Sequence, residues 1–191
     1  MVDKQIVPAH RRRTVLTVAT VTAILILSSI YAYYQSLPPQ TGPRASIISD
    51  PLEFSIELDK SEYFDNENAS VRMVVTNVSN LTVVLTWGGA RFWGDKEAFF
   101  DYSIFDQNGT EVFRRFRGVG VEAVILSKTL SPGEQLPDEH VWTQTTGYPE
   151  FERFPKGTYS IRASTGEFFL KVGDQESFLT LETPSIIFSV V

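Results

Sequence analysis

An uncharged apolar run near the amino terminus limits what this chain can fold into. Residues 14–34 contain no charged side chain and follow directly on His10-Arg11-Arg12-Arg13. A helix needs about 20 residues to cross the hydrocarbon core of a bilayer, and this run has 21. The sequence therefore predicts a transmembrane helix at 14–34, preceded by a basic amino terminus at 1–13.

The charges that flank this run predict its orientation. Lys4 and three arginines precede it, whereas the first basic residue after it is Arg44. By the positive-inside rule, residues 1–13 stay cytoplasmic and 35–191 are extracytoplasmic. A cleaved secretory signal is the alternative, but signal peptides have apolar regions of about 7–15 residues and a small-x-small cleavage site. Ile30-Tyr31-Ala32 fits that site poorly. We therefore expect a single-pass signal anchor in the cell membrane, with secretion after cleavage as the alternative.

The composition after residue 34 limits partners and cofactors. This part has 13 basic and 22 acidic side chains and no cysteine. An acidic surface repels nucleic acid, so another partner is expected. The missing cysteines exclude disulfides, so a hydrophobic core must stabilise the fold.

The sequence of residues 35–191 predicts a stalk followed by a β domain. Residues 35–50 are rich in proline and small polar residues, which predicts a stalk, and the domain is expected at 51–191. Apolar and polar residues then alternate with the period of half-buried strands, and turn residues separate the runs. Asn108-Gly109 between two such runs predicts a hairpin with a tight primed turn of two residues. The expected strands are 54–58, 71–75, 81–85, 100–104, 112–113, 121–126, 140–143, 159–163, 168–172, 178–181 and 186–190. This pattern predicts an all-β, immunoglobulin-like antiparallel β-sandwich.

Several segments resemble a known family. Residues 74–85, 100–112, 130–134 and 155–161, together with Trp142, are similar in order and spacing to the BsuPI-type domain, named for an intracellular proteinase inhibitor of Bacillus. The resemblance implies an immunoglobulin-like sandwich and inhibition of proteases. Two segments depart from it: Trp87 to Glu97 is inserted, and Phe113-Arg114-Arg115-Phe116 replaces the Trp-Ser that often follows the hairpin. The anchor is also foreign to an intracellular inhibitor.

Catalytic residues are scarce in the exported part. His140 is the one histidine there, and there is no cysteine nucleophile. An ordinary zinc site lacks its ligands. The oxygen-rich loop at 65–68 could hold calcium, but a solvated turn explains it better. We therefore expect no enzyme activity, no cofactor and no metal.

Two loops stand out as candidate contact surfaces. One has tryptophan and phenylalanine among glycines, and the other is locally positive. Aromatic residues and arginine dominate binding hot spots. The candidate partner-binding residues are Trp87, Arg91, Phe92, Trp93, Arg114, Arg115, Phe116 and Arg117. Alternatively, Trp87 and Trp93 fold back to cover one end of the sandwich.

Four of the five asparagines begin Asn-x-Ser/Thr triplets. These candidate glycosylation sites are Asn68, Asn77, Asn80 and Asn108. They are acceptors only where an exported chain meets the right transferase, and turn preferences also explain them. Together these observations predict a membrane-anchored, surface-displayed module for binding or envelope structure, with an extracytoplasmic protein or glycan as partner. A BsuPI-like inhibitor of exported or membrane-bound proteases is the alternative.

Overall fold

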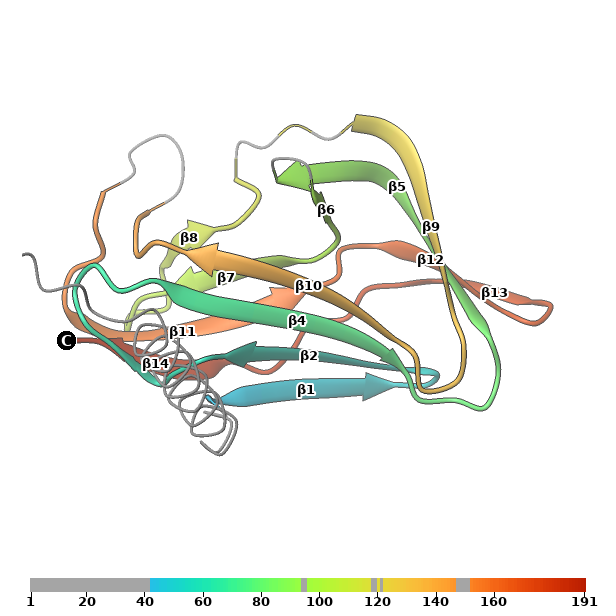
Figure 1. Ribbon diagram of the computed structural model, residues 1–191, viewed down its shortest axis with the longest axis horizontal. Coiled ribbons are helices and arrows are strands. Elements are labelled where there is room, and N and C mark those ends of the chain that lie inside the picture. The colour runs from blue at the N-terminus through green and yellow to red at the C-terminus, as the bar shows by residue number, and fades with distance from the viewer. Residues whose placement is uncertain (1–41, 94–95, 118–119, 121, 147–151) are drawn as a thin grey trace, which may run out of the picture. The chain divides into compact units, whose positions relative to one another are not determined.

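The computed structural model describes residues 42–93, 96–117, 120, 122–146 and 152–191. The predicted basic terminus and transmembrane helix lie outside these residues. From Thr41 to Val191 the chain forms one compact unit, and its described part is all-β (Figure 1). No helix of the described residues is long and apolar enough to span a bilayer.

Two sheets contain the central strands. The first sheet has the order β1-β2-β4-β10, and all its pairs are antiparallel. Its strands are β1 (Arg44–Ser49), β2 (Leu52–Leu58), β4 (Ala69–Asn77) and β10 (Gln135–Trp142). The second sheet has the order β3-β14-β11-β7-β8 and is antiparallel except for the β3–β14 pair. Its strands are β3 (Glu62–Tyr63), β14 (Ile186–Val190), β11 (Gly157–Ser164), β7 (Asp101–Phe105) and β8 (Glu111–Arg114).

A third sheet is built around the longest described strand, β5 (Val83–Trp93). Its order is β13-β12-β5-β6, and β9 also pairs with β5. The other strands are β6 (Lys96–Ala98), β9 (Glu122–Leu130), β12 (Phe168–Val172) and β13 (Gln175–Leu179). β12 and β13 form a hairpin, which is orange-red in Figure 1.

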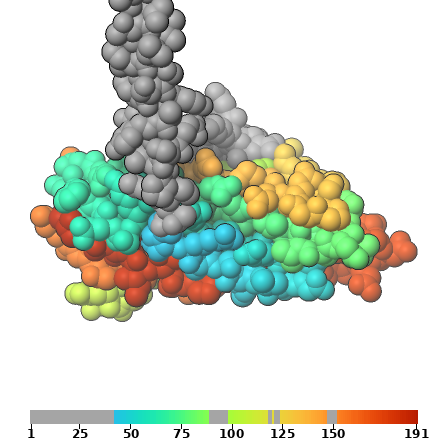
Figure 2. Space-filling model, turned by 60° about the horizontal axis from the view of Figure 1, so that its bottom comes forward, coloured from blue at the N-terminus to red at the C-terminus, as the bar shows by residue number. Residues whose placement is uncertain are grey.

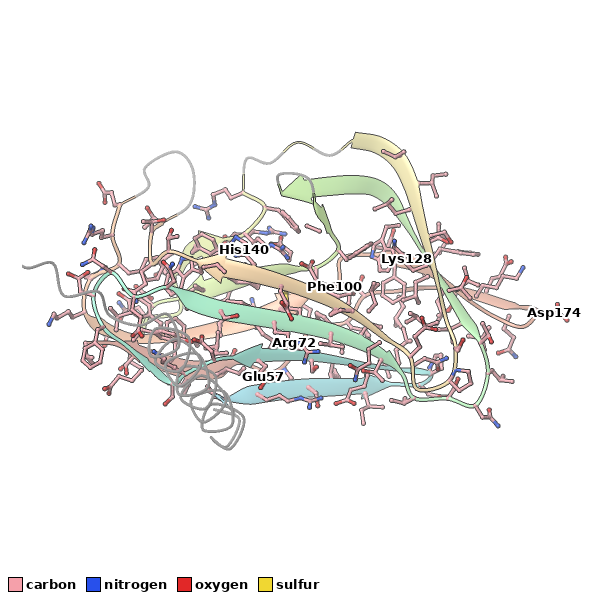
Figure 3. The ribbon with its side chains drawn as sticks, viewed as in Figure 1. Glu57, Arg72, Phe100, Lys128, His140 and Asp174 are labelled. Atoms are coloured by element: carbon pink, nitrogen blue, oxygen red, sulfur yellow. The ribbon has the colours of Figure 1, made fainter. Side chains whose placement is uncertain are left out.

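The core lies where the first two sheets face each other and extends to the third sheet, which contributes Leu85, Trp87 and Phe168. Along β11, the apolar side chains alternate with exposed or half-buried polar ones, because successive strand residues point to opposite faces. Trp142 of the first sheet contacts the second, with ring centroids 5.8 Å from Phe188 and 6.0 Å from Phe113. Phe54 lies 5.2 Å from Phe100, which is labelled in Figure 3. This arrangement is consistent with a β-sandwich.

Two predictions need correction. Residues 44–49 form β1, where Ile47 pairs with Phe54, so the predicted stalk at 35–50 is too long. The hairpin around Asn108-Gly109 is confirmed, but its connection spans residues 106–110 and is not a two-residue turn. The Asp106 carboxylate accepts the backbone N–H groups of Asn108 and Thr110, which makes the longer loop stable.

Three connections and a hairpin tip meet at one end of the unit. We call this the distal end, because β1 runs from Arg44 to the Asp50–Pro51 turn and thus away from where the preceding residues join. The Asn77 N–H donates to Glu134 O at 3.0 Å, and Val78 N–H donates to Pro51 O at 2.9 Å. The distal end therefore joins the turns that follow β1, β4 and β9.

Candidate functional site

The predicted aromatic surface is only partly at the surface. Trp87 is 7% exposed and packs on Phe99, Phe100 and Phe168, with ring centroids 5.4 to 6.3 Å apart. The expectation that Trp87 contacts a partner is therefore wrong. The burial of Trp87 agrees with the alternative that Trp87 and Trp93 fold back over one end of the sandwich, which stays untested for Trp93. Arg91, Phe92 and Trp93 lie on β5 opposite β6, and their side chains lie outside the described part.

The predicted positive loop is divided between core and surface. Arg115 and Phe116 are 3% and 7% exposed, so the expectation that they contact a partner is wrong. Arg114 and Arg117 are exposed, but Arg114 pairs with Asp101 and Arg117 with Glu111, each at 2.8 Å. The loop is therefore not an isolated positive spot.

Arg115 is buried because it makes a bidentate ion pair with Asp138. The two Arg115 Nη atoms lie 2.9 Å from the two Asp138 oxygens, and Nη1 also donates to Phe100 O at 2.7 Å. Asp138 accepts the backbone N–H groups of Phe99 and Phe100 at 2.7 and 2.9 Å. A buried charge needs such compensation. This ion pair therefore fixes the segment before β7 and the segment after β8 against β10.

His140 faces the same interior. Its Nδ1 lies 2.7 Å from the Tyr102 hydroxyl, and the side chains of Asp138, His140 and Trp142 alternate inward along β10. Burial, followed by the charge of Arg115, lowers the pKa of His140 to about 4. Burial also raises the pKa of Tyr102 above its ordinary value. Both groups are thus neutral at physiological pH, and their hydrogen bond serves the core.

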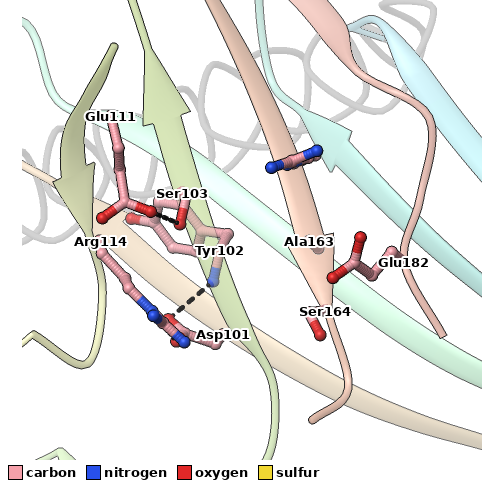
Figure 4. Close-up of a pocket in the computed structure, with 9 residues that line it drawn as sticks. Asp101, Tyr102, Ser103, Glu111, Arg114, Ala163, Ser164 and Glu182 are labelled. Carbon is pink, nitrogen blue, oxygen red and sulfur yellow. Dashed lines mark hydrogen bonds and ion pairs between the residues drawn. The ribbon is translucent and has the colours of Figure 1, made fainter. Parts of the chain in front are cut away.

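A small polar groove lies on the outer face of the second sheet. Ser103 pairs across the strands with Arg114 on one side and Arg162 on the other. Asp101 pairs with Ser164, which bridges to Glu182. The groove has a volume of about 160 Å³. Figure 4 shows its walls, with dashed lines for the Ser103–Glu111 bond and for the bond from the Tyr102 N–H to Asp101. Within the groove, Asp101 is already paired with Arg114, and Glu111 is paired with Arg117 of the segment after β8.

A larger groove lies at the distal end, and we call it the distal groove. Its volume is about 670 Å³, within the range typical of ligand sites. Three segments line it: Asp50–Pro51 from the β1–β2 turn, Ser79–Leu81 from the β4–β5 loop, and the β12–β13 hairpin. Figure 2 shows the tip of that hairpin, orange-red, beside the green residues of the β4–β5 loop. The hairpin contributes Leu170, Val172, Gln175, Glu176 and Ser177.

The distal groove combines apolar walls with carboxylates. Leu170 is buried at its base, and Leu81 is 53% exposed at its side. Asp50 and Glu176 are its charged lining residues, and Glu176 pairs with the exposed Lys171 at 3.0 Å. Close by, on the other face of the hairpin, Phe178 is 70% exposed and packs on Phe169 at 5.5 Å. Exposed apolar residues in such a setting are typical of contact surfaces.

The sequence analysis did not predict this groove, because the β12–β13 hairpin lies about 90 to 125 residues after the other two segments that line it. One local signal could have found the hairpin: Gly173-Asp174 separates two runs that pair directly, Val172 with Gln175. A two-residue turn that contains glycine between strand patterns predicts a hairpin. The approach of Pro51 and Leu81 to that hairpin has no local signal.

The four candidate glycosylation sites differ in exposure. Asn68, Asn80 and Asn108 are exposed, whereas Asn77 is 0% exposed. The Asn77 Nδ2 donates to Leu81 O at 2.7 Å and to Leu130 O at 3.0 Å. The expectation of a glycan at Asn77 is therefore wrong for the folded domain, because the side-chain amide of Asn77 joins the β4–β5 loop to the end of β9. Asn80 lines the distal groove.

The described residues contain no cluster of three or more histidine, aspartate or glutamate side chains that could hold a metal ion. In the oxygen-rich loop at 65–68, Glu67 pairs with Lys60 and accepts the Phe64 N–H.

Comparisons with known proteins assign no family. No protein-family model matches the chain, and no curated protein does. Among solved structures, the C-terminal domain of Wzt is 14% identical, with a TM-score of 0.39, covering 81% of this chain and 82% of that one. A CARDB domain from Pyrococcus furiosus is 14% identical, with a TM-score of 0.35, covering 82% and 94%. The ApaA protein of Bordetella pertussis is 11% identical, with a TM-score of 0.34, covering 78% and 89%. Similarities this low carry no function over.

Proposed function

We propose that the chain is a membrane-anchored, surface-displayed module with an immunoglobulin-like β-sandwich, and that its distal groove binds an extracytoplasmic partner. Residues 14–34 serve as the anchor, and the residues before β1 serve as a short stalk. The domain binds and does not catalyse. His140, the one histidine after the anchor, has a place in the core that suits structure better than proton transfer.

The observation that carries this proposal is the distal groove itself. It has the volume of a ligand site and combines an apolar base with carboxylates. It also lies at the end of β1 opposite Arg44, where the stalk joins by sequence. The chain that leads into β1 therefore joins the unit at Arg44 and not beside the groove.

Site-specific crosslinking tests this function. A photo-crosslinking amino acid replaces Ser177 in the distal groove, and in a matched control variant it replaces Thr158, an exposed residue of β11. Both full-length variants are illuminated in intact cells, and the products are identified by mass spectrometry. We expect a specific product from position 177 and none from position 158.

Two results would count against the proposal. Equal products from both positions would mean nonspecific contact, and no product from position 177 would remove the groove as a binding site. The BsuPI-like alternative makes a further distinction. If the product from position 177 contains a protease, and purified full-length chain suppresses that protease in proportion to its amount, the module is an inhibitor.

A further inference from the structure

The wall of the distal groove includes an open strand edge. β13 ends the third sheet, with β12 on one side and no described strand on the other. Four of its five residues are exposed. An open edge presents backbone donors and acceptors that can pair with another chain. Sheet edges of this kind are where extended peptides add as strands.

The hairpin geometry defines which backbone groups face the open edge. The two-residue connection Gly173-Asp174 joins Val172 to Gln175, and Gly173 has a φ of 57°. In a two-residue hairpin the pair beside the turn is hydrogen-bonded, and bonded and non-bonded pairs then alternate. Glu176 and Phe178 belong to the non-bonded pairs with β12. Their N–H and C=O groups therefore point toward the open edge.

The two faces of this edge differ in chemistry. On one face lies the distal groove, with Leu81 and Leu170 as apolar walls. The side chains of Glu176 and Phe178 point to the other face, opposite Lys171 and Phe169 of β12, and the Glu176 carboxylate pairs with Lys171 at 3.0 Å. Glu176 thus borders the groove from the other face of the hairpin. An added strand would place alternate side chains on these two faces. It would therefore need apolar side chains on the groove face and a basic side chain beside Glu176.

The surrounding charge favours a cationic partner. Asp50 and Glu176 line the groove, none of its described lining residues is a lysine or arginine, and Asp174 is at the hairpin tip (Figure 3). Glu176 pairs with Lys171 across the hairpin at 3.0 Å, so Asp50 and Asp174 carry the local charge that no described ion pair opposes. After residue 34 the chain has 13 basic and 22 acidic side chains. Pairing with the β13 edge of a second copy would bring together two hairpins that each carry Asp174 and Glu176 against one lysine, Lys171, and like charges across strands destabilise pairing. Charge complementarity thus selects a basic segment over a second copy.

We propose that the partner is an extended peptide segment with alternating basic and apolar residues, which adds as a strand to the open edge of β13. Its apolar side chains contact Leu81 and Leu170 in the groove. Its basic side chains lie beside Glu176, and their aliphatic stems cover Phe178. This inference rests on the proposed function and names the class of partner for the same site.

The test uses the full-length chain in detergent micelles and a defined probe. The probe is an eight-residue peptide of alternating lysine and valine, blocked at both ends, and the control peptide has glutamate in place of lysine. Binding is followed by NMR, together with amide hydrogen exchange at β13. We expect only the lysine peptide to bind, and we expect exchange at Glu176 and Phe178 to slow at least tenfold. The Gln175 and Ser177 amides, already paired with β12, should change little.

A matched pair of variants separates charge from backbone pairing. Glu176→Gln removes the carboxylate, and Glu176→Pro also removes the N–H that faces the edge, a change that edge strands tolerate. We expect Glu176→Gln to weaken peptide binding several-fold and Glu176→Pro to weaken it at least tenfold further. Amide hydrogen exchange in the core strands is measured as a control, and we expect it to be unchanged in both variants because they keep the fold.

Several outcomes would overturn this inference. Equal binding of both peptides, no binding of either, or binding without slower exchange at Glu176 and Phe178 would each exclude strand addition by a basic segment. Concentration-dependent dimers that Glu176→Pro abolishes would make the edge an interface between copies. The proposed function fails separately, because the crosslink from position 177 does not depend on what the partner's backbone does.

Discussion

The buried ion pair and the distal groove use polar groups in opposite ways. Around Asp138 the carboxylate is matched by the Arg115 guanidinium and by two backbone N–H groups, all inside the core. In the distal groove, Asp50 and Glu176 are exposed, the one described ion pair of Glu176 is with the exposed Lys171, and the adjacent edge of β13 pairs with no described strand. The first region stabilises the fold, and the second remains accessible to a partner. Both regions contain charged residues, so the presence of charge alone does not tell a stabilising region from a binding region.

Arg114 and Arg115 show that adjacent residues of the same type can lie one at the surface and the other in the core. The two are neighbours in a sequence that predicts one positive surface, yet their side chains are 54% and 2% exposed. Successive residues near a strand end point to opposite faces, so one of them reaches solvent and the other the core. A run of basic residues thus identifies a contact surface only after the strand faces are known.

The largest expected effect comes from breaking the buried pair. Asp138→Ala should lower the free energy of unfolding by about 3–5 kcal/mol, because it leaves a buried guanidinium without its partner. Urea denaturation of the full-length chain in micelles measures this. The double change Arg115→Met with Asp138→Leu should cost less than Asp138→Ala. A single-variant loss below about 1 kcal/mol would contradict the structural role given to the pair.

Two phenylalanines of the β12–β13 hairpin sharpen the comparison. Phe168 is 2% exposed, whereas Phe178 is 70% exposed. Phe168→Ala should cost about 3–5 kcal/mol, as core truncations do. Phe178→Ala should stay within about 0.5 kcal/mol, as exposed substitutions do. Thermal denaturation compares the two, and equal losses would mean that Phe178 serves the core.

Asn77 and Asn80 allow a buried asparagine to be compared with an exposed one at the distal end. Asn77→Ala should cost about 2–3 kcal/mol, because the carbonyls of Leu81 and Leu130 lose a buried donor. Asn80→Ala should change stability by less than about 0.5 kcal/mol. Chemical denaturation measures both variants. A similar cost for both would contradict the assignment of Asn77 to the interior.

Acid should weaken the core region through His140. Its pKa is about 4 in the fold and 6.5 when unperturbed, so the folded domain favours the neutral imidazole. The stabilisation is complete above pH 6.5 and is lost as pH falls toward 4, because the unfolded chain then binds the additional proton. We expect about 2 kcal/mol less stability at pH 4.5 than at pH 7 from this group. His140→Gln should flatten the loss between pH 7 and 5, and an unchanged slope would exclude His140 as its source.

Local sequence patterns predicted most of the strands, but they did not predict the contacts between segments that are distant in the chain. The alternation in 54–58, 71–75 and 159–163 defined β2, β4 and β11, because one face of each strand must be buried. β1 was not predicted, because its apolar residues Ile47 and Ile48 are adjacent and do not alternate with polar residues. Trp87 and Arg115 were assigned to the surface because composition does not report strand facing.

The candidate site depended even more on distant segments. The distal groove needs the Asp50–Pro51 turn, the loop before β5 and the β12–β13 hairpin to meet, and no local pattern encodes that meeting. The ion pair between Arg115 and Asp138 likewise joins residues 23 positions apart. The sequence did reveal the acidity of the domain, and this acidity now supports a basic partner.

One thiol-labelling measurement tests the central claim most directly. The chain has no cysteine, so Asn80→Cys places a single thiol in the distal groove and Asn108→Cys places one on another exposed loop. A membrane-impermeant maleimide is applied to intact cells and, separately, to each purified variant. We predict that both thiols react in intact cells, but that position 80 reacts several-fold more slowly relative to position 108 than in the purified protein, because the partner covers the groove. Labelling only after lysis would contradict surface display, and an unchanged ratio would contradict binding at the distal groove.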